Sequence, residues 1–381
     1  MDFALSEEQT AIFDMARSFA VDRIEPNALD WERDEVMPRD LLKELGELGM
    51  ASIYVGEEYG SDLTRLDAAL IFEGLSYGCA STAAFLSIHN MCAWMIDSFA
   101  DDDLKARVLP KMTSADTICS YCLTEPGSGS DAAALRTSAQ KMNDGYVLNG
   151  TKAFISGGGY SDLYLAMVRT GEPGPKGISA VLIEDGSEGL SFGANENKMG
   201  WRNQPTAQVQ FDDCKIPLEN LVGDEGRGFS YAMMGLDGGR LNISACALGA
   251  AQSALDKSVA YMGERKAFGK HLHDFQALQF KLADMETDLQ AARIFLRQAA
   301  WKLDRKEPDA TKHCAMAKKF VTDIAFNVAN DALQLHGGYG YLNDYGVEKI
   351  VRDLRVHQIL EGTNQIMNVI VSRALLQEKA A

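Results

Sequence analysis

The 381-residue sequence has no run of about 18 apolar residues, so it predicts no transmembrane helix and no membrane role. It also has too few basic residues for a general nucleic-acid-binding protein, because 54 acidic residues outnumber 37 lysines and arginines. The resulting net charge of −17 repels phosphate backbones and anionic membranes. An anionic ligand is therefore expected only where arginine or lysine side chains gather locally.

Metal-site and disulfide patterns are missing as well. The six histidines form no His-Glu-x-x-His pair, and a polar loop explains His271 and His273 equally well. The seven scattered cysteines are an odd number, which predicts reduced thiols in a cytoplasmic protein. One Cys-x-x-Cys, Cys119 to Cys122, lies in an apolar run; on a strand its two side chains would point to opposite faces. Buried small residues are therefore favoured over a zinc or redox pair.

Three segments differ in their hydrophobic pattern, and the composition is that of an ordinary globular protein. Residues 1–116 are predicted to be an N-terminal helical domain, which begins with a Ser6–Gln9 capping box and leaves no room for a targeting segment. Residues 117–228 alternate short β-rich runs with turns and have no long helices between them. This pattern predicts a middle antiparallel β-domain rather than a doubly wound parallel sheet. Residues 229–381 are predicted to be a C-terminal helical bundle domain.

More local patterns give further expectations. Asn149-Gly150 between two β-rich runs predicts a hairpin with a type I′ turn. Residues 163–168, 178–183 and 207–211 are predicted strands. The helix 83–99 contains His89, Asn90 and Asp97, which fit either a helix near a binding site or a plain core helix. Four leucines are expected on one face of an N-terminal helix: Leu41, Leu42, Leu45 and Leu48. Seven apolar residues spaced alternately 4 and 3 apart predict a bundle seam that could also serve a subunit interface: Leu278, Leu282, Met285, Leu289, Ala292, Leu296 and Ala299.

Six stretches have more glycine and polar residues than structure alone requires: 121–131, 154–159, 236–240, 264–269, 334–340 and 361–365. None is a P-loop or a dinucleotide-binding fingerprint. Each has a plain alternative, such as a surface turn, close helix packing, a solvated helix end or a glycine cap. Glu361 follows an apolar run and could act as a general base, or it could simply favour the N-terminus of the next helix.

In their order along the chain, these stretches resemble the acyl-CoA dehydrogenase family over essentially the whole length. Residues 121–131 look like the flavin-binding signature of that family, and residues 334–340 with 354–365 look like its second signature. The resemblance implies an α+β fold with an N-terminal all-α domain, a middle antiparallel β-domain and a C-terminal four-helix bundle. Residues 88–98, 119–126 and 355–361 are similar to the branch that acts on isobutyryl-CoA.

The resemblance implies an FAD-dependent α,β-dehydrogenation of a short branched-chain acyl-CoA, with isobutyryl-CoA giving methacrylyl-CoA in valine breakdown. Glu361 matches the base that takes the α-proton while a hydride passes to flavin N5, and its backbone N–H matches a donor to the thioester oxygen. Members of the isovaleryl type have their base where this chain has Gly239, which cannot act as one. The alternatives are a dehydrogenase of short straight-chain or 2-methyl-branched substrates, a flavin oxidase on the same fold, and a helical scaffold without catalysis.

The resemblance also implies individual contacts and partners. The implied FAD contacts are Tyr121, Cys122, Leu123, Thr124, Gly129, Ser130, Phe154, Ile155, Ser156, Arg265, Phe275, Gln276, Gln334, Leu335, His336, Gly337, Gly338, Thr363, Asn364 and Gln365. The implied substrate contacts are Ser130, Asp237, Gly238, Gly239, Arg240 and Arg373. In the family a neighbouring subunit donates the group at 265–276 and 334–338, which implies a homotetramer built as a dimer of dimers. Electron-transfer flavoprotein is the implied electron acceptor, and no metal is implied.

Overall fold

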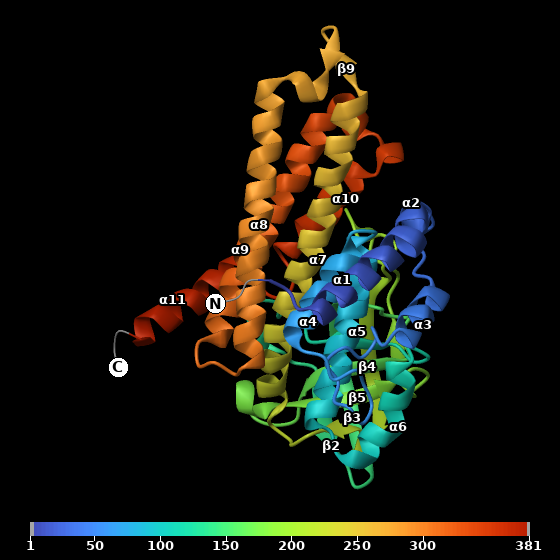
Figure 1. Ribbon diagram of the computed structural model, residues 1–381. Coiled ribbons are helices and arrows are strands. Elements are labelled where there is room, and N and C mark those ends of the chain that lie inside the picture. The colour runs from blue at the N-terminus through green and yellow to red at the C-terminus, as the bar shows by residue number, and fades with distance from the viewer. Residues whose placement is uncertain (1–3, 379–381) are drawn as a thin grey trace.

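The computed structural model describes residues 4–378, so the ends of the first and last predicted domains lie outside the described residues. Figure 1 shows helices around a sheet in one half of the molecule and a long helical bundle that projects away from it. The N-terminal helices are α1 Glu7–Phe19, α2 Ala28–Asp34, α3 Arg39–Glu47, α4 Arg65–Ser76, α5 Ala80–Phe99 and α6 Asp102–Thr113. The expected capping box opens α1, since the Ser6 hydroxyl accepts from Gln9 N–H and the Gln9 side chain accepts from Ser6 N–H.

Two details of these helices answer the sequence-based expectations. Leu41, Leu42 and Leu45 are buried, but Leu48 lies just beyond the end of α3 and is exposed, so the expected stripe is one residue too long. In α5, His89 Nδ1 accepts from Cys119 N–H and its Nε2 therefore donates to the Met112 carbonyl. Asn90 likewise bonds the backbone of Met50 and Ile53, so both polar residues serve the core.

The middle segment forms an eight-stranded sheet in the order β6-β7-β3-β2-β4-β5-β8, with β1 beside β4. Its strands are β1 Cys119–Cys122, β2 Ser138–Lys141, β3 Gly145–Ser156, β4 Leu163–Arg169, β5 Ile178–Glu184, β6 Leu190–Phe192, β7 Thr206–Pro217 and β8 Leu221–Val222. The longer pairings are antiparallel as expected, whereas β1 runs parallel to β4. Cys119 and Cys122 point into different clusters of core residues, on opposite sides of β1, as the alternation predicts.

The predicted hairpin at Asn149-Gly150 is wrong. β3 runs straight through these residues and pairs with β2 on one side and β7 on the other. The register of β3 against β7 shifts between Leu148 and Gly150, and Gly150 adopts φ +145° against Thr137. The two turn-forming residues therefore make a bulge, because the long-range pairing of β3 with β7 outweighs a local preference, and the chain turns at 142–144 between β2 and β3 instead.

The C-terminal bundle consists of α7 Gly228–Glu264, α8 Gln276–Asp304 and α9 Ala310–His336, and α10 Val347–His357 packs against α7 and α9 as the fourth helix. The short strands β9 Lys266–Ala267 and β10 Lys270–His271 cap its projecting end, and α11 Asn364–Glu378 runs out from its side (Figure 1). The predicted seam on α8 is confirmed, with five residues buried and two partly buried: Met285, Leu289, Ala292, Leu296, Ala299, Leu278 and Leu282.

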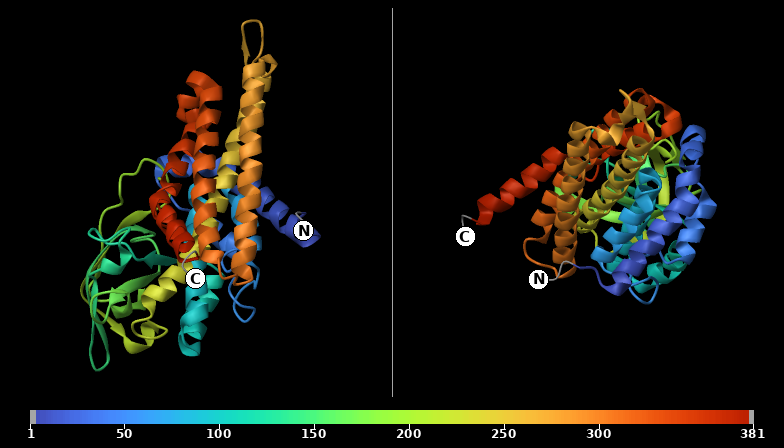
Figure 2. Two further views of the ribbon diagram at one scale, coloured as in Figure 1. Left: turned by 90° about the vertical axis from the view of Figure 1, so that its left-hand side faces the viewer. Right: turned by 45° about the horizontal axis from the view of Figure 1, so that its top comes forward.

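The 37-residue helix α7 is the central element, since it contacts α4, α5, α8, α9 and the sheet. It approaches α4 very closely, because a Cβ on Gly249 would collide with the backbone carbonyl of Glu73. Figure 2 shows that one end of α7 lies beside the sheet and the other reaches the projecting end of the bundle. Within residues 4–378, no helix is both long and apolar enough to cross a membrane.

Candidate active site

Glu361 lies in the short turn between α10 and α11, where the residue as a whole is partly exposed. The turn places Glu361 at φ +55° and Gly362 at φ +85°, both in the left-handed region. For a non-glycine residue this conformation costs on the order of 1–3 kcal/mol and persists only where surrounding contacts enforce it. The backbone strain therefore marks a residue whose side-chain direction is fixed by its surroundings.

The Glu361 carboxylate is aimed at a glycine face of α7. A Cβ on Gly239 would lie 2.5 Å from Glu361 Oε2, so only glycine leaves room for the carboxylate at that position. Oε2 is buried and has no hydrogen-bond partner among the described residues. Burial raises the pKa of Glu361 to about 7, although Arg240 and Lys318 act to lower it. A carboxylate with that pKa is suited to accept a proton near neutral pH.

Arg240 and Asp237, two predicted substrate contacts, lie on α7 next to Glu361. Arg240 Nη1 donates to Asp237 Oδ1 at 2.6 Å, and the Thr311 hydroxyl donates to Asp237 Oδ2 at 2.6 Å. Arg240 Nε also reaches the Glu361 carbonyl at 3.5 Å. The structure thus brings Asp237, Gly239 and Arg240 together with Glu361, and a buried cation faces the backbone of the turn.

Tyr121 on β1 reaches the same interior region from the sheet. Its hydroxyl is buried without a hydrogen-bond partner among residues 4–378. Burial and the charge of Glu361 raise the pKa of Tyr121, which places the two side chains near each other. Cys122 and Leu123 have buried side chains, so any contact they make with a cofactor runs through their backbone.

The loop after β1 has an internal anchor that the sequence did not reveal. Glu125 accepts from Arg136 N–H at 2.6 Å and Thr137 N–H at 2.8 Å, and from Lys152 Nζ at 2.8 Å. Both partners of this ion pair are buried, with Lys152 fully inaccessible. A Cβ on Gly127 or Gly129 would meet no atom within 4 Å, so the glycines border open space.

Two features of this region fit a flat aromatic cofactor such as flavin. Phe154 lies near the end of β3 at φ +57° with its side chain 67% exposed, beside the buried Ile155. The unpartnered Tyr121 hydroxyl and the backbone of the glycine loop offer hydrogen bonds close by. Thr124, Ser130 and Ser156 are also at least partly accessible, so the residues present are compatible with the implied FAD contacts.

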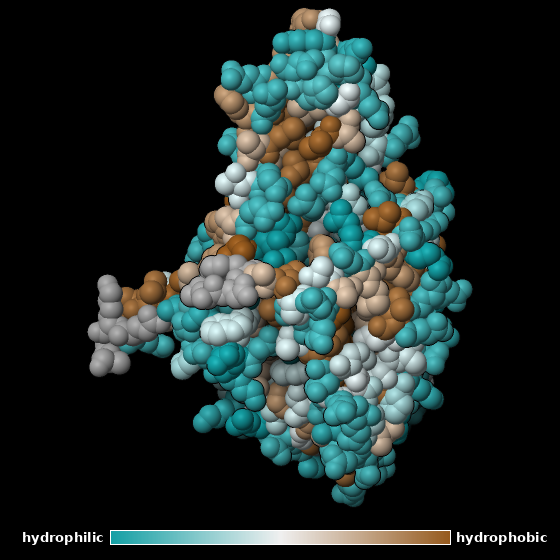
Figure 3. Space-filling model, viewed as in Figure 1, coloured by the Kyte–Doolittle hydropathy of each residue, from teal (hydrophilic) through white to brown (hydrophobic). Residues whose placement is uncertain are grey.

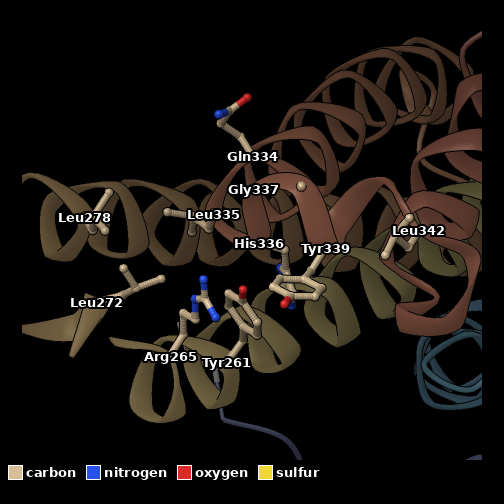
Figure 4. A pocket seen from close by; sticks show the side chains of 11 residues that line it. Tyr261, Arg265, Leu272, Leu278, Gln334, Leu335, His336, Gly337, Tyr339 and Leu342 are labelled. Atoms are coloured by element: carbon tan, nitrogen blue, oxygen red, sulfur yellow. The ribbon is translucent and has the colours of Figure 1, made fainter. Parts of the chain in front are cut away.

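The second group of predicted cofactor contacts lies at the projecting end of the bundle, around a cavity of about 600 Å³ (Figure 4). The cavity is lined by Tyr261, Arg265, Leu272, Leu278, Gln334, Leu335, His336, Gly337, Gly338, Tyr339 and Leu342. The Tyr261 and His336 rings stack with centroids 4.5 Å apart, and the Arg265 guanidinium lies 5.3 Å from the Tyr339 ring centroid. Figure 4 shows the Gln334 side chain pointing away from Arg265.

The two groups are far apart within one chain. Gly239 and Arg265 are separated by 26 residues of α7, and a rise of 1.5 Å per residue puts them about 39 Å apart along the helix axis. Phe275 and Gln276 lie with Arg265 at the projecting end, where α8 begins. Phe268 lies there too, with 95% of its side chain exposed; sequence patterns did not single it out, although it belongs to the 264–269 stretch.

The remaining predicted residues lie on α11 and just before it. Thr363 Oγ1 accepts from Ile366 N–H and caps the helix, and Gln365 is exposed. The Asn364 side chain is buried and bonds Lys318, Thr322 and Asp323 of α9, so the implied contact of Asn364 with FAD would run through its backbone. Arg373 is exposed on α11 and forms no ion pair within residues 4–378.

Sequence patterns also missed an arginine stack beside the site. The Arg65 guanidinium lies 3.7 Å from the Tyr54 ring centroid and 4.6 Å from that of Trp94. Its Nη1 is buried without a partner among the described residues and is pressed against Gly238. An arginine in the first turn of a helix is usually solvated, so the residues around Arg65 in the sequence did not indicate that it is buried beside the site. In the same described part of the chain, no group of three or more His, Cys, Asp or Glu side chains could hold a metal ion.

Three family models match the chain in succession. They are the N-terminal, middle and C-terminal domains of acyl-CoA dehydrogenase, at residues 6–116, 120–214 and 226–376. Isobutyryl-CoA dehydrogenase, mitochondrial, from Bos taurus is 51% identical over 98% of this chain and 90% of its own length. The chain belongs to the acyl-CoA dehydrogenase family. The Dictyostelium discoideum protein of the same name is 53% identical over the same shares of both chains.

Solved structures agree with membership of the acyl-CoA dehydrogenase family. Butyryl-CoA dehydrogenase from Megasphaera elsdenii superposes with a TM-score of 0.95 at 38% identity, covering 99% of this chain and all of that one. A chain from a study of the electron transferring flavoprotein of Acidaminococcus fermentans gives 0.96 at 41% identity, with 99% and 100% coverage. The FAD complex of PigA gives 0.94 at 30% identity, with 98% and 99% coverage. The three-domain acyl-CoA dehydrogenase fold is thereby confirmed, while the boundaries 1–116, 117–228 and 229–381 remain predictions.

Proposed function

We propose that this acyl-CoA dehydrogenase uses FAD to oxidise a short branched-chain acyl-CoA, with isobutyryl-CoA giving methacrylyl-CoA. The observation that carries the proposal is Glu361, with a pKa near 7, whose Oε2 is buried without a partner among the described residues and faces the glycine surface of α7. The two relatives at 51% and 53% identity, which are named isobutyryl-CoA dehydrogenases, support the choice of acyl group.

The residues around Glu361 can perform the proton-transfer half of this reaction. Glu361 removes the α-proton of the thioester, and its N–H has no acceptor among residues 4–378, which leaves it available to the thioester oxygen. Arg240 holds the Glu361 carbonyl from the α7 side. FAD, when bound, would accept the β-hydride, and Tyr121, Phe154 and the loop after β1 would hold its ring system.

Bulky side chains next to Glu361 support a short acyl group. Met91 Sδ lies 3.2 Å from the position of a Cβ on Gly239, and the stack of Tyr54, Arg65 and Trp94 packs against Gly238. A long straight chain would have to displace these side chains, whereas one methylene more or less changes binding by only about 1–3 kcal/mol. Butyryl-CoA and 2-methylbutyryl-CoA are therefore the nearest alternative substrates.

Anaerobic bleaching of the flavin tests the proposal. Purified protein is mixed with isobutyryl-, butyryl-, 2-methylbutyryl-, isovaleryl- or octanoyl-CoA, and flavin absorbance is followed by stopped flow. Isobutyryl-CoA should reduce the flavin fastest and octanoyl-CoA should be poor, while Glu361→Gln should retain flavin but not be reduced. An optimum at octanoyl-CoA would refute the choice of acyl group, and bleaching of Glu361→Gln at the normal rate would refute the base. In a separate assay in air, rapid reoxidation of the reduced flavin by oxygen would favour the oxidase alternative.

The proposal extends to assembly and partners. A homotetramer built as a dimer of dimers would let the Arg265 cavity of one subunit complete the cofactor site of another, since one chain holds these groups about 39 Å apart. Electron-transfer flavoprotein is the proposed acceptor, in keeping with the family and with the similarity to the chain from Acidaminococcus fermentans. All seven cysteines are unpaired and buried, which supports a reducing compartment such as the cytoplasm. The two isobutyryl-CoA dehydrogenases that the chain resembles are named as mitochondrial proteins.

A further inference from the structure

Lys318 of α9 is a fully buried lysine directly behind the turn that carries Glu361. Its Nζ donates to the Gly362 carbonyl at 2.9 Å and to Asn364 Oδ1 at 2.8 Å. Burying an ammonium group is costly unless it is paired and hydrogen-bonded. Both of these bonds go to residues within three positions of Glu361, so the ammonium group serves the turn.

Two further side chains of α9 hold the same turn. Asn364 Nδ2 donates to Thr322 Oγ1 at 3.0 Å and to Asp323 Oδ1 at 2.8 Å. Gln358, at the start of the turn, donates from Nε2 to Asp323 Oδ1 at 2.8 Å. Lys318, Thr322 and Asp323 therefore form a polar cradle, called the α9 cradle below, that grips the turn before and after Glu361.

The α9 cradle supplies what the strained backbone requires. Glu361 and Gly362 both have positive φ, and such a turn relaxes unless neighbouring contacts fix it. Among residues 4–378, the one hydrogen bond from α7 to the turn is the 3.5 Å contact between Arg240 and the Glu361 carbonyl, so most of the polar contacts that fix the turn come from α9.

We propose that Lys318 is the positioning residue of the candidate base: it ties the Gly362 carbonyl and the Asn364 amide to α9 and so fixes the turn that points Glu361 at Gly239. The inference rests on the proposed function, because it assigns Glu361 the role of base. Lys318 itself touches neither substrate nor cofactor and acts through Glu361.

The charges around the pair are consistent with this role. Burial lowers the pKa of Lys318 to about 7, Glu361 and Asp323 act to raise it, and Arg240 lowers it. Lys318 in turn lowers the pKa of Glu361, as does Arg240, and it also lowers that of the buried His357 on α10. Removing the Lys318 charge should therefore leave Glu361 both less well placed and harder to ionise.

The test compares two variants of the buried lysine, Lys318→Met and Lys318→Gln, with the control Lys319→Met. Lys319 is the next residue on α9; it is partly exposed, and its Nζ lies 3.9 Å from Asp323 Oδ2. The control therefore removes a positive charge at almost the same place without touching the turn. The acyl-CoA that bleaches the wild-type flavin fastest is used, whatever its chain. Lys318→Met should slow flavin reduction by about 10²-fold with flavin content retained. The midpoint of the pH–rate profile should move up by about one pH unit. Lys319→Met should stay within twofold of wild type with an unchanged midpoint.

A second readout needs no substrate. The difference in unfolding free energy between a Lys318 variant with Glu361 and the same variant with Glu361→Gln, measured from pH 5 to 9, reports the Glu361 ionisation directly. The midpoint should again be higher in Lys318→Met than in the wild-type background. If no acyl-CoA bleaches the wild-type flavin, the proposed function fails while this midpoint still tests Lys318.

Three outcomes would overturn the proposal. The first is a Lys318→Met variant that reduces its flavin within twofold of the wild-type rate and whose midpoint lies within about 0.2 pH unit of the wild-type midpoint, which is roughly the error of such profiles. The second is a slow variant with an unmoved midpoint in both readouts, which would make Lys318 purely structural. The third is failure of both Lys318 variants to fold while Lys319→Met folds, which would assign the lysine to the core.

Discussion

At the scale of single residues, Glu361 works against the stability of the fold that holds it. Burial without a hydrogen bond to Oε2 raises its pKa from 4.5 in the unfolded chain to about 7. A raised folded-state pKa means that the favourable contribution exists below pH 4.5 and is lost as the pH rises to about 7. The ionised Glu361 carboxylate is thus less stable in the folded protein than in water, as expected for a base that must take up a proton.

We predict that Glu361→Gln stabilises the protein at high pH. The amide does not ionise, so the unfolding free energy of the variant should exceed that of wild type by up to about 3 kcal/mol above pH 7 and by little at pH 4.5. Denaturant unfolding at several pH values measures this difference. Glu264→Gln, at an exposed helix end, is the matched control and should show no such gain. A constant difference from pH 4.5 to 8.5 would contradict the prediction.

We also predict that Gly239→Ala disables the site without removing the flavin. The new Cβ would lie 2.5 Å from Glu361 Oε2 and 3.0 Å from its Cδ, so the carboxylate must move. A displacement near 1 Å costs about 10²-fold in rate. Stopped-flow reduction together with the flavin-to-protein absorbance ratio checks this expectation. Reduction within threefold of wild type would show that the carboxylate has more freedom than the structure gives it.

At the scale of secondary structure, the sequence predicts best the elements whose signal is local. The seam of α8 repeats every 3 or 4 residues, and all seven positions face the bundle interior at least in part. The predicted hairpin at Asn149-Gly150 was wrong because β3 continues through these residues in pairing with β7, which lies far along the chain and outside any local window. The other partner of β3 is β2, which directly precedes it, so the chain turns at 142–144 instead. The predicted leucine stripe was one residue too long, because α3 ends at Glu47 and Leu48 lies beyond it.

The candidate site divides in the same way. Glu361 stood out because it belongs to a recognisable motif beside an apolar run. Lys318 and Arg65 did not, since each lies on a helix with polar neighbours and resembles a solvated side chain until distant segments cover it. The Lys152–Glu125 pair was hidden for the same reason, because its two members are 27 residues apart and meet where the loop after β1 lies beside β3.

The contact between α7 and α4 gives a prediction at this scale. Gly249→Ala should lower the unfolding free energy by about 1–3 kcal/mol, because its Cβ meets the Glu73 carbonyl, which belongs to the backbone of α4. Gly235→Ala on the same helix is the control, since its Cβ meets only the flexible ends of Met95 and Met91 and gains up to about 1 kcal/mol of helix propensity. Equal unfolding free energies for the two variants would contradict the assigned packing.

At the scale of the whole molecule, the projecting end of the bundle exposes several large hydrophobic side chains. Phe268 is 95% exposed, and Phe280 and Val259 on the nearby parts of α8 and α7 are each more than half exposed. Figure 3 shows a hydrophobic area just below the mainly hydrophilic tip of the projecting bundle, with further hydrophobic areas on the rest of this face. Such an apolar surface beside the Arg265 cavity fits contact with a second copy of the chain.

We predict that Arg265→Ala weakens FAD retention more than it slows chemistry. Arg265 presents forked donors suited to a pyrophosphate, and the cavity around it would belong to the cofactor site of a neighbouring subunit. Flavin occupancy after gel filtration should fall well below that of wild type, while enzyme refilled with excess FAD should be reduced by substrate within about threefold of the normal rate. Unchanged flavin occupancy with unchanged assembly would contradict the prediction.

The length of α7 predicts that two different variant chains can restore each other's activity. If each cofactor site takes Glu361 from one chain and Arg265 from another, two inactive variants should complement each other. A mixed pair of Glu361→Gln and Arg265→Ala chains contains one site with both defects and one site with neither. Co-expression of the two, each with its own affinity tag, should therefore restore activity that neither homomer has at limiting FAD, and tandem purification should recover it in the mixed species. Because a single helix about 55 Å long joins the two half-sites, every chain would be at once the catalyst of one site and the cofactor holder of the next.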